Sequence, residues 1–139
     1  MKKTFSWDAG TATCTTFYKN RAFTGTAHCH PEDADFESER VGLHIAETRV
    51  DILVLQYIRN TELKPAIAAL KRIQDAFDHS SKYNAKSYEA KTIRRQLRQL
   101  EMELAAVNNE LATLRLNLRA YIHAKEKLYQ KLRKDRNKQ

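Results

Sequence analysis

The chain contains little glycine, proline or cysteine and no long apolar run. Its 139 residues include 3 Gly, 2 Pro, 2 Cys and 1 Trp. This composition gives poor support to a Gly-rich cofactor fold, a collagen-like repeat or a long disordered linker. No stretch approaches the roughly 18 to 20 apolar residues of a membrane-spanning helix, and Met1-Lys2-Lys3 does not lead into an apolar signal core. We therefore expect a cytoplasmic protein with no membrane attachment.

Charge is abundant but unevenly distributed. Residues 1–79 contain 10 Lys and Arg against 11 Asp and Glu, a net charge of −1, whereas residues 80–139 contain 15 against 6, a net charge of +9. A positive potential on one half of a molecule attracts polyanions such as DNA, RNA or acidic protein surfaces. The remaining composition, 42% hydrophobic and 30% charged, is enough for one modest, mostly helical domain.

The N-terminal segment has the alternation of a sheet. Residues 11–18 and 21–29 alternate with a period of two, which predicts two strands joined by a turn at residues 19–20. In that register Cys14 faces Gly25. The face of small apolar side chains is the one we expect to be buried, and it contains Ala12, Cys14, Phe23, Gly25, Ala27 and Cys29.

A second turn signal, Asp8-Ala9-Gly10, leaves open whether the sheet has two strands or three. With a third strand over residues 4–7, Phe5 and Trp7 would join the buried face. A sheet of two or three short strands is not stable alone in water. We therefore expect it to pack on the segments that follow.

From residue 38 onward, apolar residues recur at steps of three and four, which predicts helices. An acidic connection around Pro31 separates them from the strands, and Pro65 predicts a kink, or a cap and a restart. The acidic residues are Glu32, Asp33, Asp35 and Glu37. The first helical stripe contains Leu43, Ala46, Val50, Leu53 and Tyr57, and the second contains Ile67, Leu70, either Ile73 or Gln74, and Phe77.

The most regular pattern is a heptad seam that begins at Ile93 and continues to Leu132, broken only by Lys125. At about 1.5 Å per residue it is roughly 60 Å long, close to the length of residues 38–79 as a helix. We therefore predict an antiparallel helical hairpin. Whether the seam pairs only within the chain or also forms a homodimer stays open. The complete seam contains Ile93, Leu97, Leu100, Leu104, Val107, Leu111, Leu114, Leu118, Tyr121, Lys125, Leu128 and Leu132. Seven of these residues are the predicted core or oligomerisation positions: Leu97, Leu100, Leu104, Val107, Leu111, Leu114 and Leu118.

These patterns predict a mostly helical α+β fold. A small N-terminal antiparallel β-hairpin or three-stranded sheet would pack on a long antiparallel helical hairpin or coiled coil. We expect residues 1–37 to form the sheet and the acidic connection, and residues 38–139 to form the helical hairpin with its basic C-terminal helix, as one structural unit.

Metal binding and catalysis have weak support. His28-Cys29-His30, with Cys14 and Glu32 nearby, lacks the spacing of a zinc site, so we expect no metal and no cofactor. With two cysteines and no secretion signal, free buried thiols are expected. No Cys or Ser is placed against a His and an orienting acid, so we expect no catalytic residues and no enzymatic activity.

Two basic groups are the candidate surface for nucleic acid or a protein partner. The first contains Lys82, Lys86, Lys91, Arg94, Arg95 and Arg98. The second contains Lys125, Lys127, Lys131, Arg133, Lys134 and Arg136, with Tyr121 and Tyr129 interleaved and Lys138 following. The alternative is that these cations only solvate a long surface helix and favour its C-terminus.

Two segments of the chain, FTGTAHCHPEDADF at residues 23–36 and SERVGLHIAE at residues 38–47, resemble a group of small phage and prophage proteins of Gram-positive bacteria. Leu63-Lys64-Pro65 and the basic helical half share the likeness, which covers about residues 12–134. The resemblance implies a mobile-element accessory protein in the cytoplasm of a bacterial host, and it brings no catalytic residues. Small phage proteins often bind host machinery, and inhibitors of CRISPR nucleases are one such class.

The functional prediction is a non-enzymatic phage or prophage accessory protein without a membrane partner. It would bind a host protein–nucleic acid complex, or nucleic acid itself, through its basic helical half, as an anti-CRISPR-like inhibitor would. The competing hypothesis is a coiled-coil homo-oligomeric scaffold in which the charge only provides solubility.

Overall fold

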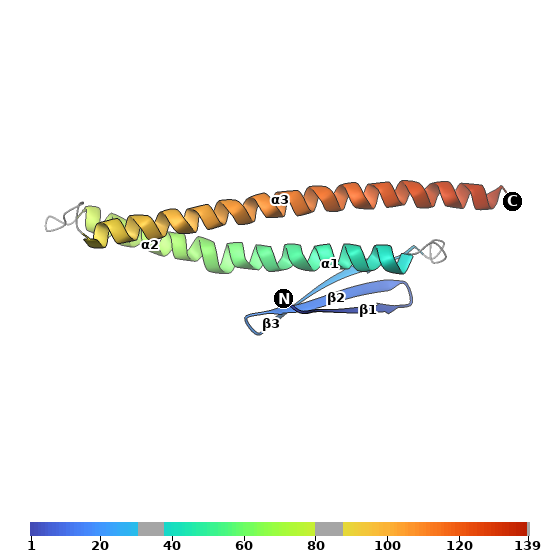
Figure 1. Ribbon diagram of the computed structural model, residues 1–139, viewed down its shortest axis with the longest axis horizontal. Coiled ribbons are helices and arrows are strands. Elements are labelled where there is room, and N and C mark those ends of the chain that lie inside the picture. The colour runs from blue at the N-terminus through green and yellow to red at the C-terminus, as the bar shows by residue number, and fades with distance from the viewer. Residues whose placement is uncertain (31–37, 80–87, 139) are drawn as a thin grey trace. The chain divides into compact units, whose positions relative to one another are not determined.

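The structure, a computed structural model, describes residues 1–30, 38–79 and 88–138. Three strands come first (Figure 1): β1 Lys3–Asp8, β2 Thr11–Tyr18 and β3 Arg21–His28. The helical elements are α1 Ser38–Tyr57, the π-helical turn η2 Ile58–Leu63, α2 Lys64–Asp78 and α3 Tyr88–Asn137. The predicted α+β class is confirmed, and the third strand is present. None of the helices in the described ranges combines the length and apolar character needed to cross a bilayer.

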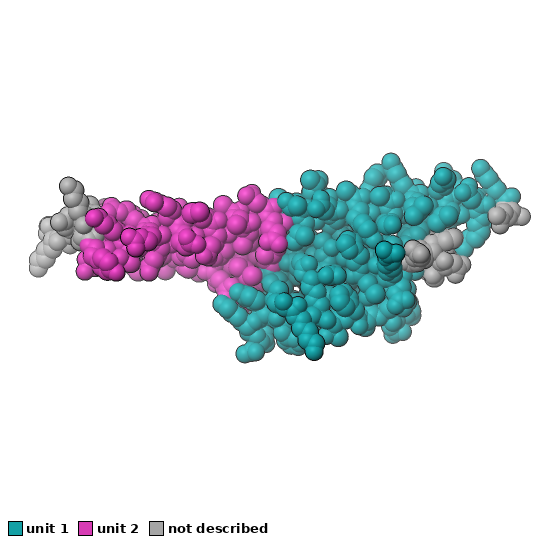
Figure 2. All heavy atoms as spheres, viewed as in Figure 1, with its two compact units in different colours: residues 1–54, 112–139 teal, residues 55–111 magenta. Residues whose placement is uncertain are grey.

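The chain divides into two compact units (Figure 2). Unit 1 is Met1–Val54 with Ala112–Gln139, and unit 2 is Leu55–Leu111. Unit 1 therefore contains the sheet, most of α1 and the C-terminal part of α3. The predicted domain division at residue 37 stays a prediction, and the acidic residues expected around Pro31 lie outside the described residues.

The sheet is antiparallel, with strand order β1-β2-β3. Cys14 lies opposite Gly25, as the turn position predicted. Lys19 and Asn20 have φ angles of 49° and 63°, the left-handed conformation that the tight hairpin turn requires. The register expected from the sequence is therefore confirmed.

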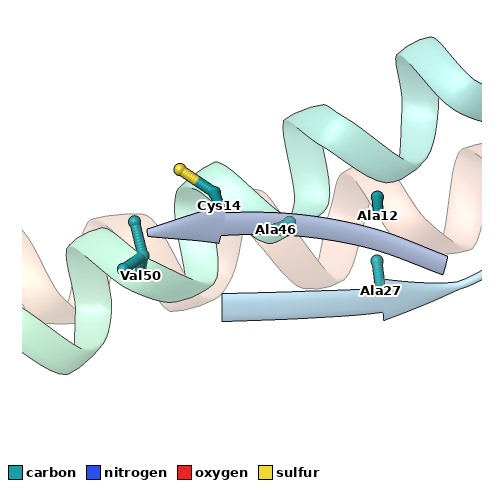
Figure 3. Close-up of a cluster of buried hydrophobic side chains, with 5 residues drawn as sticks. All are labelled: Ala12, Cys14, Ala27, Ala46 and Val50. Atoms are coloured by element: carbon teal, nitrogen blue, oxygen red, sulfur yellow. The ribbon is translucent and has the colours of Figure 1, made fainter. Parts of the chain in front are cut away.

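Small side chains let the sheet approach α1 closely. The buried cluster contains Ala12, Cys14, Ala27, Ala46 and Val50 (Figure 3). A Cβ atom on Gly25 would lie 2.7 Å from the Val50 backbone nitrogen and closer still to the carbonyl oxygen of Ala46. The sheet thus packs directly against the backbone of α1, and this contact fixes the position of β3 in unit 1.

Phe5 was expected on the buried face of the sheet, but its side chain is exposed. It pairs with Cys14 and shares the face of the sheet that packs on α1. β1 is an edge strand, and Phe5 borders an open hollow that Leu43 and Glu47 also line. Its neighbour on the same face, Trp7, is partly buried against the core.

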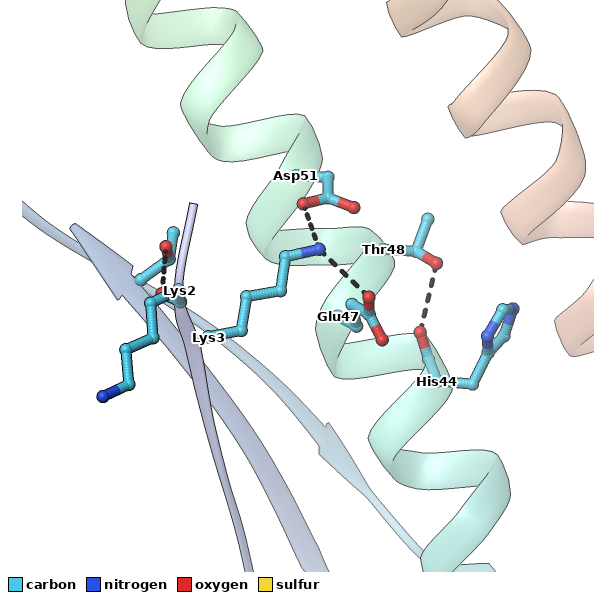
Figure 4. Close-up of polar contacts among 7 residues, drawn as sticks. Lys2, Lys3, His44, Glu47, Thr48 and Asp51 are labelled. Atoms are coloured by element: carbon cyan, nitrogen blue, oxygen red, sulfur yellow. Dashed lines mark hydrogen bonds and ion pairs between the residues drawn. The ribbon is translucent and has the colours of Figure 1, made fainter. Parts of the chain in front are cut away.

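A lysine connects β1 to α1 (Figure 4). Lys3 Nζ lies 3.0 Å from Glu47 Oε1 and 2.9 Å from Asp51 Oδ1. Burial by itself lowers the pKa of the Lys3 ammonium, but the hydrogen bonds and negative charges of Asp51 and Glu47 outweigh it and raise that pKa above its ordinary value of 10.5. The ammonium therefore stays charged at neutral pH and holds the edge strand on α1.

Two predicted apolar stripes are wrong by one residue. In α1, Leu53 is exposed and Val54 is buried. In α3, Leu128 is 44% exposed, whereas Tyr129 is 8% exposed. A straight α-helix has 3.6 residues per turn, so its buried face drifts by about 20° per heptad relative to a strict seven-residue repeat. Over several heptads this drift moves the buried position from Leu128 to Tyr129.

In unit 2, the π-helical turn η2 directly precedes the start of α2, where Pro65 is the second residue. Pro65 has no N–H group to donate to the carbonyl of Thr61, and the Lys64 N–H bonds instead to the carbonyl oxygen of Arg59, five residues earlier. The helix therefore continues across Pro65 without a side-chain cap. In α2, Ile67 is buried, which follows the predicted stripe.

The sequence left open whether Ile73 or Gln74 belongs to the inward-facing stripe of α2. Gln74 is half-buried and Ile73 is exposed, so Gln74 occupies that position. On α3, the heptad positions of unit 2 face inward: Leu97 and Leu111 are buried, and Leu100, Leu104 and Val107 are half-buried. In unit 1, Leu114 and Leu118 are half-buried as well. The predicted seam is therefore covered to a large extent within a single chain.

Candidate functional site

The first basic group lies in unit 2, at the start of α3. Lys91, Arg94, Arg95 and Arg98 occupy positions i, i+3, i+4 and i+7, so they share one face of the helix, and all four are exposed. We call them the α3 basic cluster. Lys82 and Lys86, predicted to join them, lie outside the described residues.

The second basic group divides into two sets. The first set, which we call the lysine row, contains Lys127, Lys131, Lys134 and Lys138, spaced four, three and four residues apart and all exposed. Arg136 is exposed too. The second set, Lys125 and Arg133, is half-buried and lines a cleft of unit 1. The sequence grouped all of these residues because they are close along the chain, but the helix separates them around its axis.

The cleft, about 480 Å³ in volume, lies where the end of β3 meets α1 and α3. Among the described residues that line it, Arg49, Lys125 and Arg133 are cationic and Glu126 is acidic. The apolar wall contains Ala27, Val41, Ile45 and Ile122. His28 and His30, at and just beyond the end of β3, also line the cleft, and so does the largely buried Tyr129.

Packing and hydrogen bonds hold the cations of the cleft in place. Arg49 Nη1 donates a hydrogen bond of 2.7 Å to the carbonyl oxygen of Thr26 on β3. Lys125 Nζ lies 5.5 Å from the ring centroid of Tyr121, whose ring is in turn 4.4 Å from that of His44 on α1. Burial raises the pKa of the Tyr121 phenol, and the positive charge of Arg40 opposes part of this effect. Tyr121 therefore stays neutral beside Lys125.

No family model, curated protein or solved structure matches this chain. The candidate sites therefore stand on their own geometry and charge.

The histidine and cysteine group does not form a metal centre in the described part of the chain. There, no group of three or more His, Cys, Asp and Glu side chains could hold a metal ion. His28 Nδ1 lies 3.1 Å from Thr11 Oγ1, and the Cys29 thiol donates to the carbonyl oxygen of His30 at 3.2 Å. Both groups therefore have local hydrogen-bond partners.

The two thiols differ in their surroundings. Both Cys14 and Cys29 are free. Cys14 is buried, and burial raises the pKa of its thiol, partly opposed by the positive charge of Lys3. Cys29 was expected to be buried but is half-exposed, because it lies beyond the last paired residue of β3 and lines the cleft.

Sequence reasoning missed Arg49 as a site residue and missed the cleft altogether. A helical signal was present on α3: Ile122, Lys125, Tyr129 and Arg133 recur at steps of three and four and therefore share one face. The strict heptad pattern did not reveal this face, because Tyr129 and Arg133 each lie one residue after a seam position, Leu128 and Leu132. Arg49 has no such signal, because its role depends on how β3 lies beside α1.

Proposed function

We propose that this protein is a non-enzymatic accessory protein that binds nucleic acid, alone or within a host nucleoprotein, through exposed cations of α3. The observation that carries the proposal is the lysine row. Lys127, Lys131 and Lys134 emerge on one side of α3, and Lys138, in the turn directly after the helix, extends the row to about 16 Å at a rise of 1.5 Å per residue. Each strand of B-DNA presents a phosphate about every 3.4 Å, so a row of this length spans several phosphates.

The local charge balance supports the same proposal. Residues 112–139 contain nine Lys and Arg residues against two acidic residues, Glu126 and Asp135. A solvated helix that only needed solubility would be expected to mix the two signs more evenly. The α3 basic cluster adds a second set of exposed cations in unit 2.

The resemblance to phage and prophage proteins extends this proposal to the partner. A host nucleoprotein, of which CRISPR nucleases are one class, would offer both a nucleic acid and a protein surface. A pull-down of the tagged protein from host lysate, with and without nuclease treatment, separates the two cases. A partner that survives nuclease treatment supports nucleoprotein binding, whereas nucleic acid alone supports general polyanion binding.

A charge-reversal variant tests the α3 basic cluster. Changing Arg94, Arg95 and Arg98 together to Glu is expected to abolish binding of a fluorescent duplex or single strand, measured by anisotropy, because three attractive contacts become repulsive. The helical content, read by circular dichroism, should stay the same. Unchanged binding would remove this cluster from the interface.

The scaffold hypothesis also has an observation in its favour, since Met102 and Leu116 on α3 are 62% and 63% exposed. Leu111, by contrast, is 1% exposed within one chain, so Leu104→Asp with Leu111→Asp would unfold the protein rather than dissociate an assembly. Leu116→Asp is the sharper variant. Light scattering should show a loss of mass for this variant if the protein is a homo-oligomer, and a monomeric wild type counts against the scaffold.

A further inference from the structure

We propose that the outer edge of β1 is the interface with a second copy of this chain, in which the two β1 strands pair antiparallel about a two-fold axis at Phe5. The two sheets then form one continuous sheet with three strands from each copy. The proposed function does not require this dimer. The interface includes neither the lysine row nor the exposed Leu116 of α3.

The turn between β1 and β2 determines which backbone groups of β1 point outward. Its two residues have φ angles of 49° and 85°, so the residues that flank them, Asp8 and Thr11, form a hydrogen-bonded pair. Such pairs alternate with non-hydrogen-bonded pairs along an antiparallel ladder. The backbone N–H and C=O groups of Lys3, Phe5 and Trp7 therefore point away from β2, toward the position of a further strand.

The opposite edge of the sheet supports this alternation. Counted from the two-residue turn before β3, Thr26 belongs to a non-hydrogen-bonded pair, so its carbonyl should point away from β2. Arg49 of α1 donates its hydrogen bond of 2.7 Å to that carbonyl. The edge of β3 is therefore covered in part by a side chain of the same copy.

The β1 side of the sheet is more accessible. Residues 4–6 of β1 are all exposed, and Phe5 borders the open hollow that Leu43 of α1 also lines. Residues 31–37, which the structure does not describe, connect His30 to Ser38, and both of these line the cleft beside β3 rather than this hollow. The described residues therefore leave the edge of β1 open to a second strand.

The charges of β1 favour one antiparallel register and a second copy as the partner. With Phe5 opposite its own copy, Lys2 lies opposite the partner subunit's Asp8, and this pair occurs twice. Lys2 and Asp8 are exposed, and the Lys2 side chain points away from α1 (Figure 4). Since only alternate residues point their backbone groups outward, the register shifts by two residues at a time, which would place Lys2 opposite Ser6 or Asp8 opposite Thr4. Opposite charges directly across a strand pair stabilise it.

The layers of unit 1 leave room for this pairing. α1 packs on all three strands, through contacts at Trp7, Ala12 and Gly25, so it lies over the middle of the sheet. In the dimer the two β2 strands would be three strand spacings apart, about 14 Å. Packed helices need roughly 8–10 Å between their axes, so the two α1 helices fit side by side on one face. The exposed Phe5 and half-buried Leu43 of each copy would lie between them and lose contact with water.

Analytical ultracentrifugation of the full chain over a range of concentrations tests the proposal. We expect the wild type to reach twice the 16.2 kDa mass of one chain. Phe5→Asp brings two like charges together at the two-fold axis and should weaken the dimer by about tenfold or more. The matched control, Leu116→Asp, also replaces an exposed apolar residue by an acid, but on α3, and should change dimerisation less than about twofold. Circular dichroism checks that each variant is folded.

A charge swap tests the register. Lys2→Glu alone, or Asp8→Lys alone, places like charges opposite each other at both ends of the interface and should weaken the dimer by about tenfold or more. Lys2→Glu combined with Asp8→Lys restores opposite charges and should recover the wild-type affinity within about threefold. The swap keeps the net charge of the chain, so the acidic residues within 31–37 contribute equally to both proteins. Lys64→Glu, the same charge change at an exposed position of α2, should leave dimerisation unchanged.

Three results would overturn the proposal. A wild type that stays monomeric at every concentration would leave the edge of β1 to a strand of another protein. A dimer that is lost in Leu116→Asp but kept in Phe5→Asp would place the contact on α3. A swap variant no tighter than the two single variants would reject the register and its charge pairs. Duplex binding by the lysine row is measured separately from mass, so this proposal and the proposed function can fail independently.

Discussion

At the scale of single residues, Gly25 occupies a position with no room for a side chain. In Gly25→Ala the added Cβ would meet the backbone of α1 at Ala46 and Val50, and backbone atoms of a helix cannot rotate away as a side chain can. We expect a loss of about 1–3 kcal/mol in the free energy of unfolding, typical of overpacking. Thr24→Ala, on the exposed face of the same strand, should cost far less, and equal losses in denaturant titrations would show that the sheet is not held this close.

Lys3 gives a prediction with a defined pH dependence. Its ammonium pKa is raised in the folded state, so its stabilisation is complete below about pH 10.5, the ordinary lysine value, and is lost as the pH rises through the folded-state pKa. Lys3→Met should destabilise the protein by about 1 kcal/mol at neutral pH. The difference from wild type should shrink above pH 10.5, as measured by urea unfolding across pH.

Lys71→Met is the control for Lys3. Lys71 Nζ lies 4.0 Å from Glu101 Oε1, and both side chains are about half exposed, so this pair is expected to contribute close to nothing. A Lys3→Met effect no larger than that of Lys71→Met would contradict a structural role for the link between β1 and α1.

These two positions show where sequence reasoning stops at the residue scale. Strand alternation and the turn placed Gly25 opposite Cys14 correctly, because register depends on local chain geometry. The close approach to α1 could not be read from the sequence, since it depends on the separation of two packed layers. Lys3 meets Glu47 and Asp51 across more than forty residues, and no local pattern encodes such a pairing.

At the scale of elements, the register of the buried face on α3 distinguishes a straight helix from a strict heptad. Tyr129→Ala should cost about 2–4 kcal/mol, because it removes a large buried side chain. Leu128→Ala, one residue earlier, should cost less than about 1 kcal/mol, because its side chain is already substantially exposed. The reverse order in thermal or denaturant unfolding would restore the heptad assignment.

The elements themselves were largely predictable. Periods of two and of three to four residues identified the strands and helices, because these repeats follow from backbone geometry. The exact residues that are buried along each helix could not be predicted, since a drift of about 20° per heptad changes which of two adjacent residues faces inward. At Pro65 the sequence predicted an interruption, but the π-helical turn depends on how the neighbouring backbone recovers its hydrogen bonds.

At the scale of the whole molecule, charge asymmetry was readable from the sequence and the cleft was not. Counting residues locates the positive excess after residue 79. The cleft combines Ala27 of β3, Arg49 of α1 and Arg133 of α3, so it exists only after folding brings these elements together. Proximity along the sequence assigns Lys125 and Lys127 to one group. In the folded helix, however, Lys125 lines the cleft and Lys127 is exposed to solvent.

The salt dependence of binding decides whether net charge or the lysine row recognises a polyanion. Each phosphate contact contributes about 0.9 to the slope of log K against log salt for duplex DNA. Changing Lys127, Lys131 and Lys134 to Gln should therefore reduce the magnitude of that slope by roughly 2 to 3. Lys2→Gln, Lys19→Gln and Arg21→Gln remove the same charge from the N-terminal segment that contains the sheet, and should leave the slope unchanged. Anisotropy titrations from 50 to 200 mM salt, on the order of physiological strength, measure both. An equal change in the two triple variants would mean that net charge alone attracts the polyanion, and the row would then have no specific role.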